Sequence, residues 1–267
     1  MPESRLVQLP LGLDGHERTW FEAFSVSVRV LRVAFDRLSA TLEGAVGHIS
    51  ASVYPSAIGD AWTIVDVLHR ARSLLWTRAP AFVSADAEFK ASRGAFDALM
   101  KDFGELRNSV QHLDNELAAL IDADTSVWGA ISWKRLISIE RFEMCALAST
   151  RMGAGTLNFG LTSVPTDGRP VSEIHLQAHG KRVSLSEQCV RLESVADVLV
   201  RLLDDKFSRD PAQAPEMVLG IELGPDGQFS SGPDGKPDAR LNVSTTEPLP
   251  KAKGKRSRRP RGIAGQG

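Results

Sequence analysis

Residues 15 to 50 carry the feature that most constrains the fold. Apolar side chains recur there at steps of three and four, the spacing of one helix face. They are Trp20, Phe24, Val28, Leu31, Phe35, Leu38 and Leu42. Asp14, directly before the pattern, is a residue type that caps helix N-termini. Because so long a stripe needs other helices to cover it, the pattern predicts a helical bundle.

Three further helices are predicted before residue 125. The second covers about 56 to 78 and begins after the break at Pro55. The third, about 84 to 102, begins at Ser84, and a fourth follows Gly104. Four helices with short connections favour an antiparallel bundle. The tryptophans Trp62, Trp76, Trp128 and Trp133 are interpreted as core residues, the last two as anchors of the segment that leaves the bundle.

Short strands and one more helix are predicted after residue 140. The strands are 141 to 149, 156 to 161, 172 to 178 and 182 to 185, with a hairpin turn at 179 to 181. A helix over 186 to 206 starts beyond the capping pair Ser184 and Glu187. The chain is therefore predicted to be mainly α. A helical bundle occupies residues 1–135, a small antiparallel sheet with a C-terminal helix occupies 136–207, and a disordered Pro- and Gly-rich tail occupies 208–267.

Charge is distributed unevenly along the chain. The net charge is −1, but residues 251 to 267 hold seven basic side chains and no acidic one. These are Lys251, Lys253, Lys255, Arg256, Arg258, Arg259 and Arg261, and they predict contacts to nucleic-acid phosphates. A flexible, solubilising terminus is the alternative.

Several other classes of site and location are not indicated. The N-terminus lacks a secretory pattern and the apolar runs are short, so we expect no membrane partner and a cytoplasmic location. Cys145 and Cys189 stand far apart without a CxxC pattern, and the six histidines are scattered, so no metal site or cofactor is predicted.

The segment LRNSVQHLDNEL, residues 106 to 117, is the candidate functional site. On a continuous helix, Asn108 and His112 project from one side, and Arg107 lies about 140° around the axis from His112. Arginine can hold a phosphate in a bidentate fork. Histidine can act as general base on a ribose 2′-hydroxyl near neutral pH. Together with Asn108 as an orienting group, this chemistry suits cleavage of RNA without a metal.

The run Arg107-Asn108-Ser109-Val110-Gln111-His112 resembles the R-x4-6-H motif of the HEPN superfamily, in the form where a polar residue follows the arginine. The resemblance extends over roughly residues 15 to 122. It implies an antiparallel helical bundle and a metal-independent endoribonuclease, often part of a stress or phage-defence system. It also implies a homodimer through the motif face, with Arg107 and His112 catalytic and Asn108 as their polar partner.

A non-catalytic role is the alternative function, because that superfamily includes inactive members that bind proteins or nucleic acid. The motif would then form a solvated or dimer-buried polar face. Arg107 would pair with Asp114 or Gln111, and His112 with Glu116. His69 and Arg70, on the second predicted helix, are candidates to face the same groove.

Overall fold

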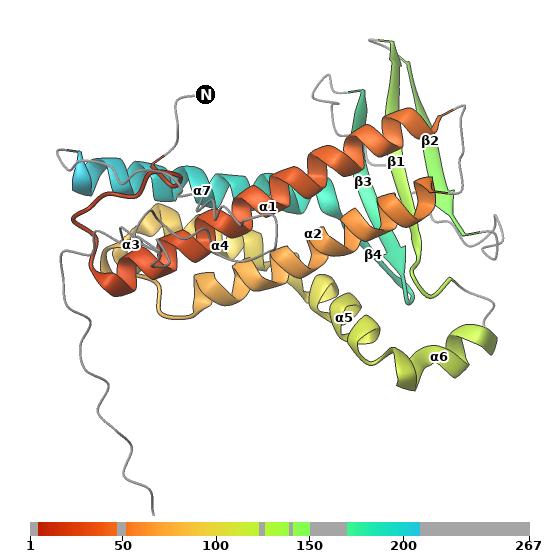
Figure 1. The fold of residues 1–267 in the computed structure, drawn as a ribbon, viewed down its shortest axis with the longest axis horizontal. Helices are drawn as coiled ribbons and strands as arrows, with labels where there is room; N and C mark the ends of the chain where they lie inside the picture. The colour runs from red at the N-terminus through yellow and green to blue at the C-terminus, as the bar shows by residue number, and fades with distance from the viewer. Residues whose placement is uncertain (1–4, 47–51, 123–125, 139–140, 150–169, 209–267) are drawn as a thin grey trace, which may run out of the picture. The chain divides into compact units, whose positions relative to one another are not determined.

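The computed structural model describes residues 5–46, 52–122, 126–138, 141–149 and 170–208. All of them belong to the first of the chain's two units, Met1–Glu216. The second unit, Met217–Gly267, lies outside the described residues and with it the predicted basic tail. The described part is mainly helical, with a four-stranded antiparallel sheet and a C-terminal helix, as the sequence predicts (Figure 1).

Two long helices form the main helical pair. Helix α1, Gly15–Ala45, begins at a complete capping box: the Asp14 side chain accepts from the Glu17 backbone N–H at 2.7 Å, and the Glu17 carboxylate accepts in return. Helix α2, Val53–Trp76, packs along α1 (Figure 1). Trp20, early in α1, donates its indole N–H to the carbonyl of Leu74, late in α2, at 2.9 Å. The two helices are therefore antiparallel, as predicted.

The third predicted helix is divided in the structure. A short α3, Ala81–Ala85, precedes α4, Ala87–Asp97, which is capped by the Asp86 side chain at 2.7 Å. The prediction of a single helix from 84 to 102 was wrong, because Asp86 caps a new helix. Helix α5, Met100–Gln111, then begins before Gly104 and not after it, and α6, Leu113–Asp122, follows.

The sheet has the strand order β2-β1-β3-β4, with all neighbours antiparallel. Its strands are β1 Ala130–Ser138, β2 Arg141–Ala148, β3 Val171–Ala178 and β4 Lys181–Ser184. The hairpin predicted at 179 to 181 is confirmed: β3 and β4 are joined by His179 and Gly180, with φ of 49° and 71°. Positive φ at both positions matches the twist of a two-residue hairpin. The predicted strand over 156 to 161 lies outside the described residues.

Strand β1 was missed in the sequence, although it is central in the sheet. Ala130 to Lys134 are all buried, so the alternation of polar and apolar residues that marks a half-exposed strand is absent. β1 also begins within the 1–135 range that was assigned to the bundle.

Helix α7, Leu185–Phe207, confirms the predicted terminal helix and packs mainly against α4. The Ser184 hydroxyl accepts from the Glu187 N–H at 3.2 Å, as the capping pair predicts. One continuous hydrophobic core includes residues of α1, α2, α7 and the sheet. Bundle and sheet residues thus share a core across the predicted boundary at residue 135. None of the described helices is long and apolar enough to cross a bilayer.

Candidate functional site

Arg107 is held in place by two side chains. Its Nε donates to Asp66 Oδ1 of α2 at 3.0 Å, and one Nη donates to Gln111 Oε1, one turn further along α5, at 3.0 Å. The Arg107 side chain keeps 25% of its surface exposed. The predicted pairing with Gln111 is therefore present, and the bond to Asp66 comes from a helix that sequence spacing did not connect to it.

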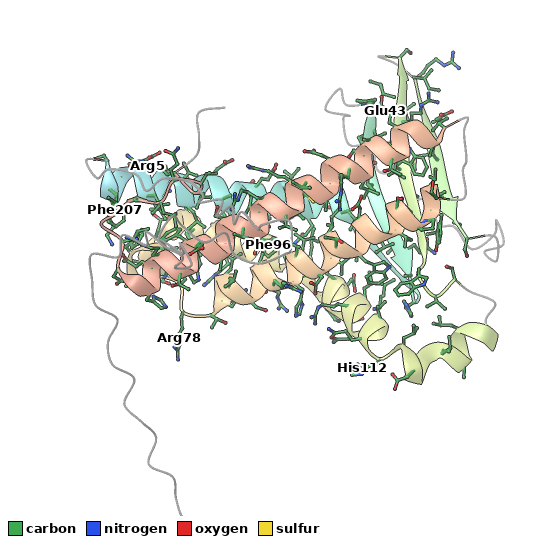
Figure 2. The ribbon with its side chains drawn as sticks, viewed as in Figure 1. Arg5, Glu43, Arg78, Phe96, His112 and Phe207 are labelled. Atoms are coloured by element: carbon green, nitrogen blue, oxygen red, sulfur yellow. The ribbon has the colours of Figure 1, made fainter. Side chains whose placement is uncertain are left out.

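His112 lies where the motif helix ends. It is the C-cap of α5, with φ −111° and ψ 34°, and its backbone N–H donates to the carbonyl of Asn108 at 3.0 Å. Both Asn108 and His112 are exposed, and Figure 2 shows His112 at the junction of α5 and α6. No hydrogen bond or ion pair joins its side chain to the described side chains.

The expectation of one continuous helix through the motif was wrong. The apolar residues expected to form one stripe along this helix differ in burial: Phe103 and Leu106 are fully buried, but Val110 and Leu113 are only half-buried. The spacing also predicts Asn115 on the same side of that helix as Asn108 and His112, but Asn115 belongs to α6, beyond the break. Neither Gly nor Pro stands at residues 111 to 113, so the sequence carries no breaker signal there.

His69 of α2 is a neighbour of the motif arginine and has a lowered pKa. Burial lowers its pKa below the usual 6.5, and the charges of Arg107 and Arg72 lower it further, while Asp66 acts in the opposite direction. Its Nδ1 is buried and has no hydrogen-bond partner among the described residues. The lowered pKa favours the neutral form of the His69 imidazole, and the charge of the motif arginine contributes to that shift.

Asp66 organises the charges of the α2 face. Besides Arg107, its other carboxylate oxygen accepts from Arg70 at 2.6 Å. Two guanidinium groups thus share one carboxylate, and the local charge is positive. An anion would be attracted to such a group, although both arginines are already partly paired.

An exposed aromatic group lies further along α2. Trp76 is 53% exposed, and the guanidinium carbon of Arg93 lies 3.9 Å from its ring centroid. Trp128 is also exposed, at 46%. The interpretation of these two tryptophans as core was wrong: it is the Trp128 backbone carbonyl, accepting from the Trp62 indole at 3.1 Å, that anchors the segment before β1.

Helix α5 is attached to the sheet at its other side. Lys181 of β4 contacts Glu105 at 2.5 Å and Asp102 at 3.6 Å. The ion pair with Lys181 lowers the pKa of Glu105. The motif arginine is therefore carried by a helix that is linked to α2 on one side and to the β3–β4 hairpin on the other.

The structure brings together Arg107, Asp66 and Gln111, with His69 close by, and leaves His112 and Asn108 in solvent. The predicted phosphate contacts of residues 251 to 261 lie outside the described residues. Within the described residues, no three His, Cys, Asp or Glu side chains are grouped to bind a metal ion. Asp66 carried no sequence signal of its own.

No protein-family model matches this chain, and neither a curated protein nor a solved structure matches it.

Proposed function

We propose that the protein is a HEPN-like endoribonuclease that cleaves RNA without a metal, with His112 as general base on a ribose 2′-hydroxyl and Arg107 as the phosphate-binding group. The observation that carries the proposal is that the motif arginine is held in place while the motif side chains remain accessible to solvent. Arg107 is fixed by two side chains and still reaches solvent, while His112 and Asn108 of the same motif are exposed. A positioned arginine loses little conformational freedom when it binds a phosphate.

A single copy does not bring the two reactive groups together. Arg107 points to α2, where Asp66 holds it, and His112 lies five residues on, at the exposed end of the helix. The proposed site therefore combines the motifs of two copies, with the arginine of one copy and the histidine of the other on the same phosphate. His112 takes the proton of the 2′-hydroxyl, and attack by the 2′-oxygen forms a new P–O bond and breaks the bond from phosphorus to the 5′-oxygen of the next nucleotide. The departing 5′-oxygen takes a proton from solvent water. The products end in a 2′,3′-cyclic phosphate and a 5′-hydroxyl.

The test compares purified wild type with His112→Ala on a mixed RNA pool in EDTA. We expect wild-type fragments with cyclic phosphate ends and their loss in the variant. His16→Ala, which replaces an exposed histidine at the start of α1, is the matched control and keeps the activity. Cleavage that survives in His112→Ala, or a wild type that cuts nothing, would reject the proposal.

Arg107 has its own matched control. Arg70 binds the same carboxylate of Asp66 from the same helix face, but it lies outside the motif. We expect Arg107→Ala to abolish cleavage and Arg70→Ala to retain most of it. Equal losses in both variants would indicate a general effect of positive charge and not a catalytic arginine.

Binding of RNA without cleavage is the second candidate, and the Trp76–Arg93 pair favours it. An exposed indole with a guanidinium over its face is the kind of platform on which single-stranded bases stack. Trp76→Ala would then weaken binding of single-stranded RNA several-fold, while Trp128→Ala, the other exposed tryptophan, would not. Neutralising the seven basic residues of 251 to 261 would reduce the salt dependence of the same binding.

A further inference from the structure

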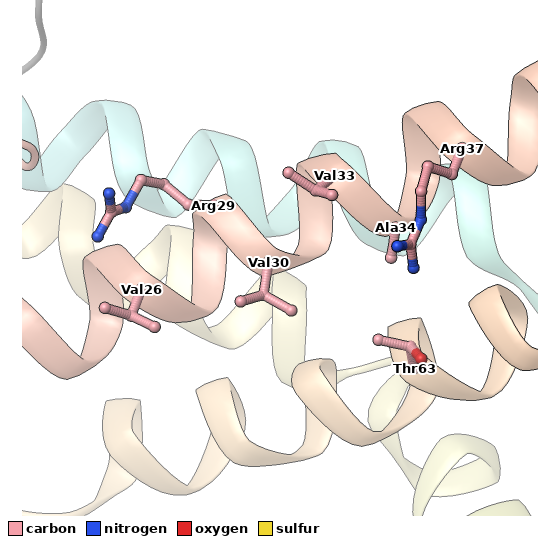
Figure 3. Close-up of a pocket in the computed structure, with 7 residues that line it drawn as sticks. All are labelled: Val26, Arg29, Val30, Val33, Ala34, Arg37 and Thr63. Carbon is pink, nitrogen blue, oxygen red and sulfur yellow. The ribbon is translucent and has the colours of Figure 1, made fainter. Parts of the chain in front are cut away.

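Helix α1 has an exposed apolar stripe on the side away from its core face. Val26, Val30 and Val33 are 43%, 41% and 56% exposed, whereas the solvent-exposed face of a helix usually carries polar residues. They line a groove of about 350 Å³ together with Thr63 of α2 (Figure 3). Isolated exposed valines need no explanation, but three at steps of four and three form one continuous stripe.

The stripe has a charged residue at each end, and the two residues have opposite charges. Glu22 lies one turn before Val26 and is exposed, and Arg37 lies one turn after Val33 with its side chain 62% exposed. From Glu22 to Arg37 the stripe stays within about 80° of the helix circumference. Arg37 also binds Asp60 of α2, which holds it at the edge of the groove.

We propose that this stripe binds the same stripe of a second copy, with the two α1 helices antiparallel about a two-fold axis between Arg29 and Val30. In this register Val26 faces Val33 of the partner subunit, and Glu22 faces Arg37 of the partner subunit. The two-fold axis repeats both contacts, so the dimer gains two ion pairs at the ends of an apolar centre. The Arg29 side chain covers the centre with its aliphatic stem.

The charge pattern selects the antiparallel arrangement. A parallel pair in register would place Glu22 beside its own copy and Arg37 beside its own copy, and like charges at these distances are unfavourable. A stripe that is acidic at one end and basic at the other is complementary to itself only when reversed. This interface is separate from the motif face on α5, where the proposed ribonuclease site joins a different pair of surfaces. A chain that makes both contacts assembles beyond a dimer, and the variants below remove only the contact between α1 stripes.

The first test measures self-association of the full-length chain by sedimentation velocity over a wide range of concentration. One helix stripe per copy is a small interface, so we expect a reversible and weak dimer. In this register Val30 faces Arg29 of the partner subunit, so Val30→Arg sets two guanidinium groups against each other on both sides of the axis and should weaken the dimer at least about tenfold. Ile137→Arg on β1 is the matched control, because Ile137 is also β-branched and 51% exposed, and it should leave the association unchanged.

The second test addresses the orientation. Glu22→Arg should abolish the dimer, and adding Arg37→Glu should restore it, because each reversed pair again joins opposite charges. In a parallel dimer the double variant would keep every position opposite its own copy and would not recover. Arg37→Glu also removes the partner of Asp60, so its folding is checked by circular dichroism.

Glu22→Gln gives an independent readout that leaves the Arg37–Asp60 contact intact. The wild-type dimer should weaken as salt is raised, and Glu22→Gln should remove most of that dependence. A wild type that remains monomeric at every concentration, or a dimer unaffected by both Val30→Arg and Glu22→Arg, would overturn the proposal.

Discussion

Gly129 should be the least replaceable of the described glycines, because two separate costs meet there. Its φ is +85°, a region that costs a residue with a Cβ roughly 1–2 kcal/mol. A Cβ at this position would also lie 2.3 Å from the carbonyl oxygen of Gln177 and 2.6 Å from the Cβ of Ala178. Both contacts belong to β3, the neighbour of β1, so a rigid backbone has to move.

The free energy of unfolding should therefore fall by about 2–5 kcal/mol in Gly129→Ala. The backbone conformation contributes the first 1–2 kcal/mol, and forced displacement in a packed region adds about 1–3 kcal/mol. The carbonyl of Gly129 also accepts from the Tyr54 hydroxyl at 2.8 Å, so a shift would disturb the link between α2 and β1.

Two other glycines separate these costs. Gly180 has a φ of +71° but open space around its missing Cβ, so Gly180→Ala should lose only about 1–2 kcal/mol. Gly104 lies inside α5 with open space and a helical backbone, and Gly104→Ala should gain about 0.5–1 kcal/mol.

The assay is urea unfolding followed by circular dichroism, with the slope against denaturant compared between variants. The expected order of stability is Gly104→Ala, wild type, Gly180→Ala, Gly129→Ala. If Gly129→Ala and Gly180→Ala lose the same free energy of unfolding to within about 0.5 kcal/mol, the steric clash proposed at Gly129 is refuted.

Three more predictions concern charged and titratable groups. Burial lowers the pKa of His175 below 6.5, so the unfolded chain takes up this proton at a higher pH than the folded chain does. The contribution of the neutral His175 to stability is therefore present above pH 6.5 and is lost as the pH falls below that value. His175→Asn should make the free energy of unfolding less dependent on pH on the acid side, and an unchanged pH dependence would contradict this. Lys134 and Glu173 form an ion pair at 2.5 Å, with side chains only 3% and 15% exposed. Lys134→Met removes the counter-charge of the Glu173 carboxylate and should lower the free energy of unfolding in urea by about 3–5 kcal/mol, and adding Glu173→Gln should recover most of that loss. A loss below about 1 kcal/mol would refute the role given to this pair. Asp66→Asn should lower stability by less than about 1 kcal/mol, because its pair with Arg107 is partly exposed. If RNA cleavage is found, the same variant should slow it by about tenfold or more through misplacement of the arginine, and an unchanged rate would exclude the positioning role.

The sequence determined the elements whose signals are local. The capping box at Asp14 and Glu17 and the cap at Ser184 fix the starts of α1 and α7, because a side chain and a backbone N–H three residues apart suffice. The pairing of the two long antiparallel helices follows from the apolar stripe of residues 15 to 50, which another helix must bury. The turn at His179 and Gly180 follows from the two-residue connection between alternating strands.

Tertiary structure alone decided the features that depend on neighbours distant in the chain. Strand β1 was hidden because both of its faces are buried in its first half. The end of α5 at Gln111 has no breaker residue, and the apolar residues on either side of it, Val110 and Leu113, are only half-buried. Arg107 could be selected from its motif, but its partner Asp66 stands 41 residues away on α2. Local spacing specifies which face a residue occupies on its own helix, and only the packing of helices specifies which residue it meets.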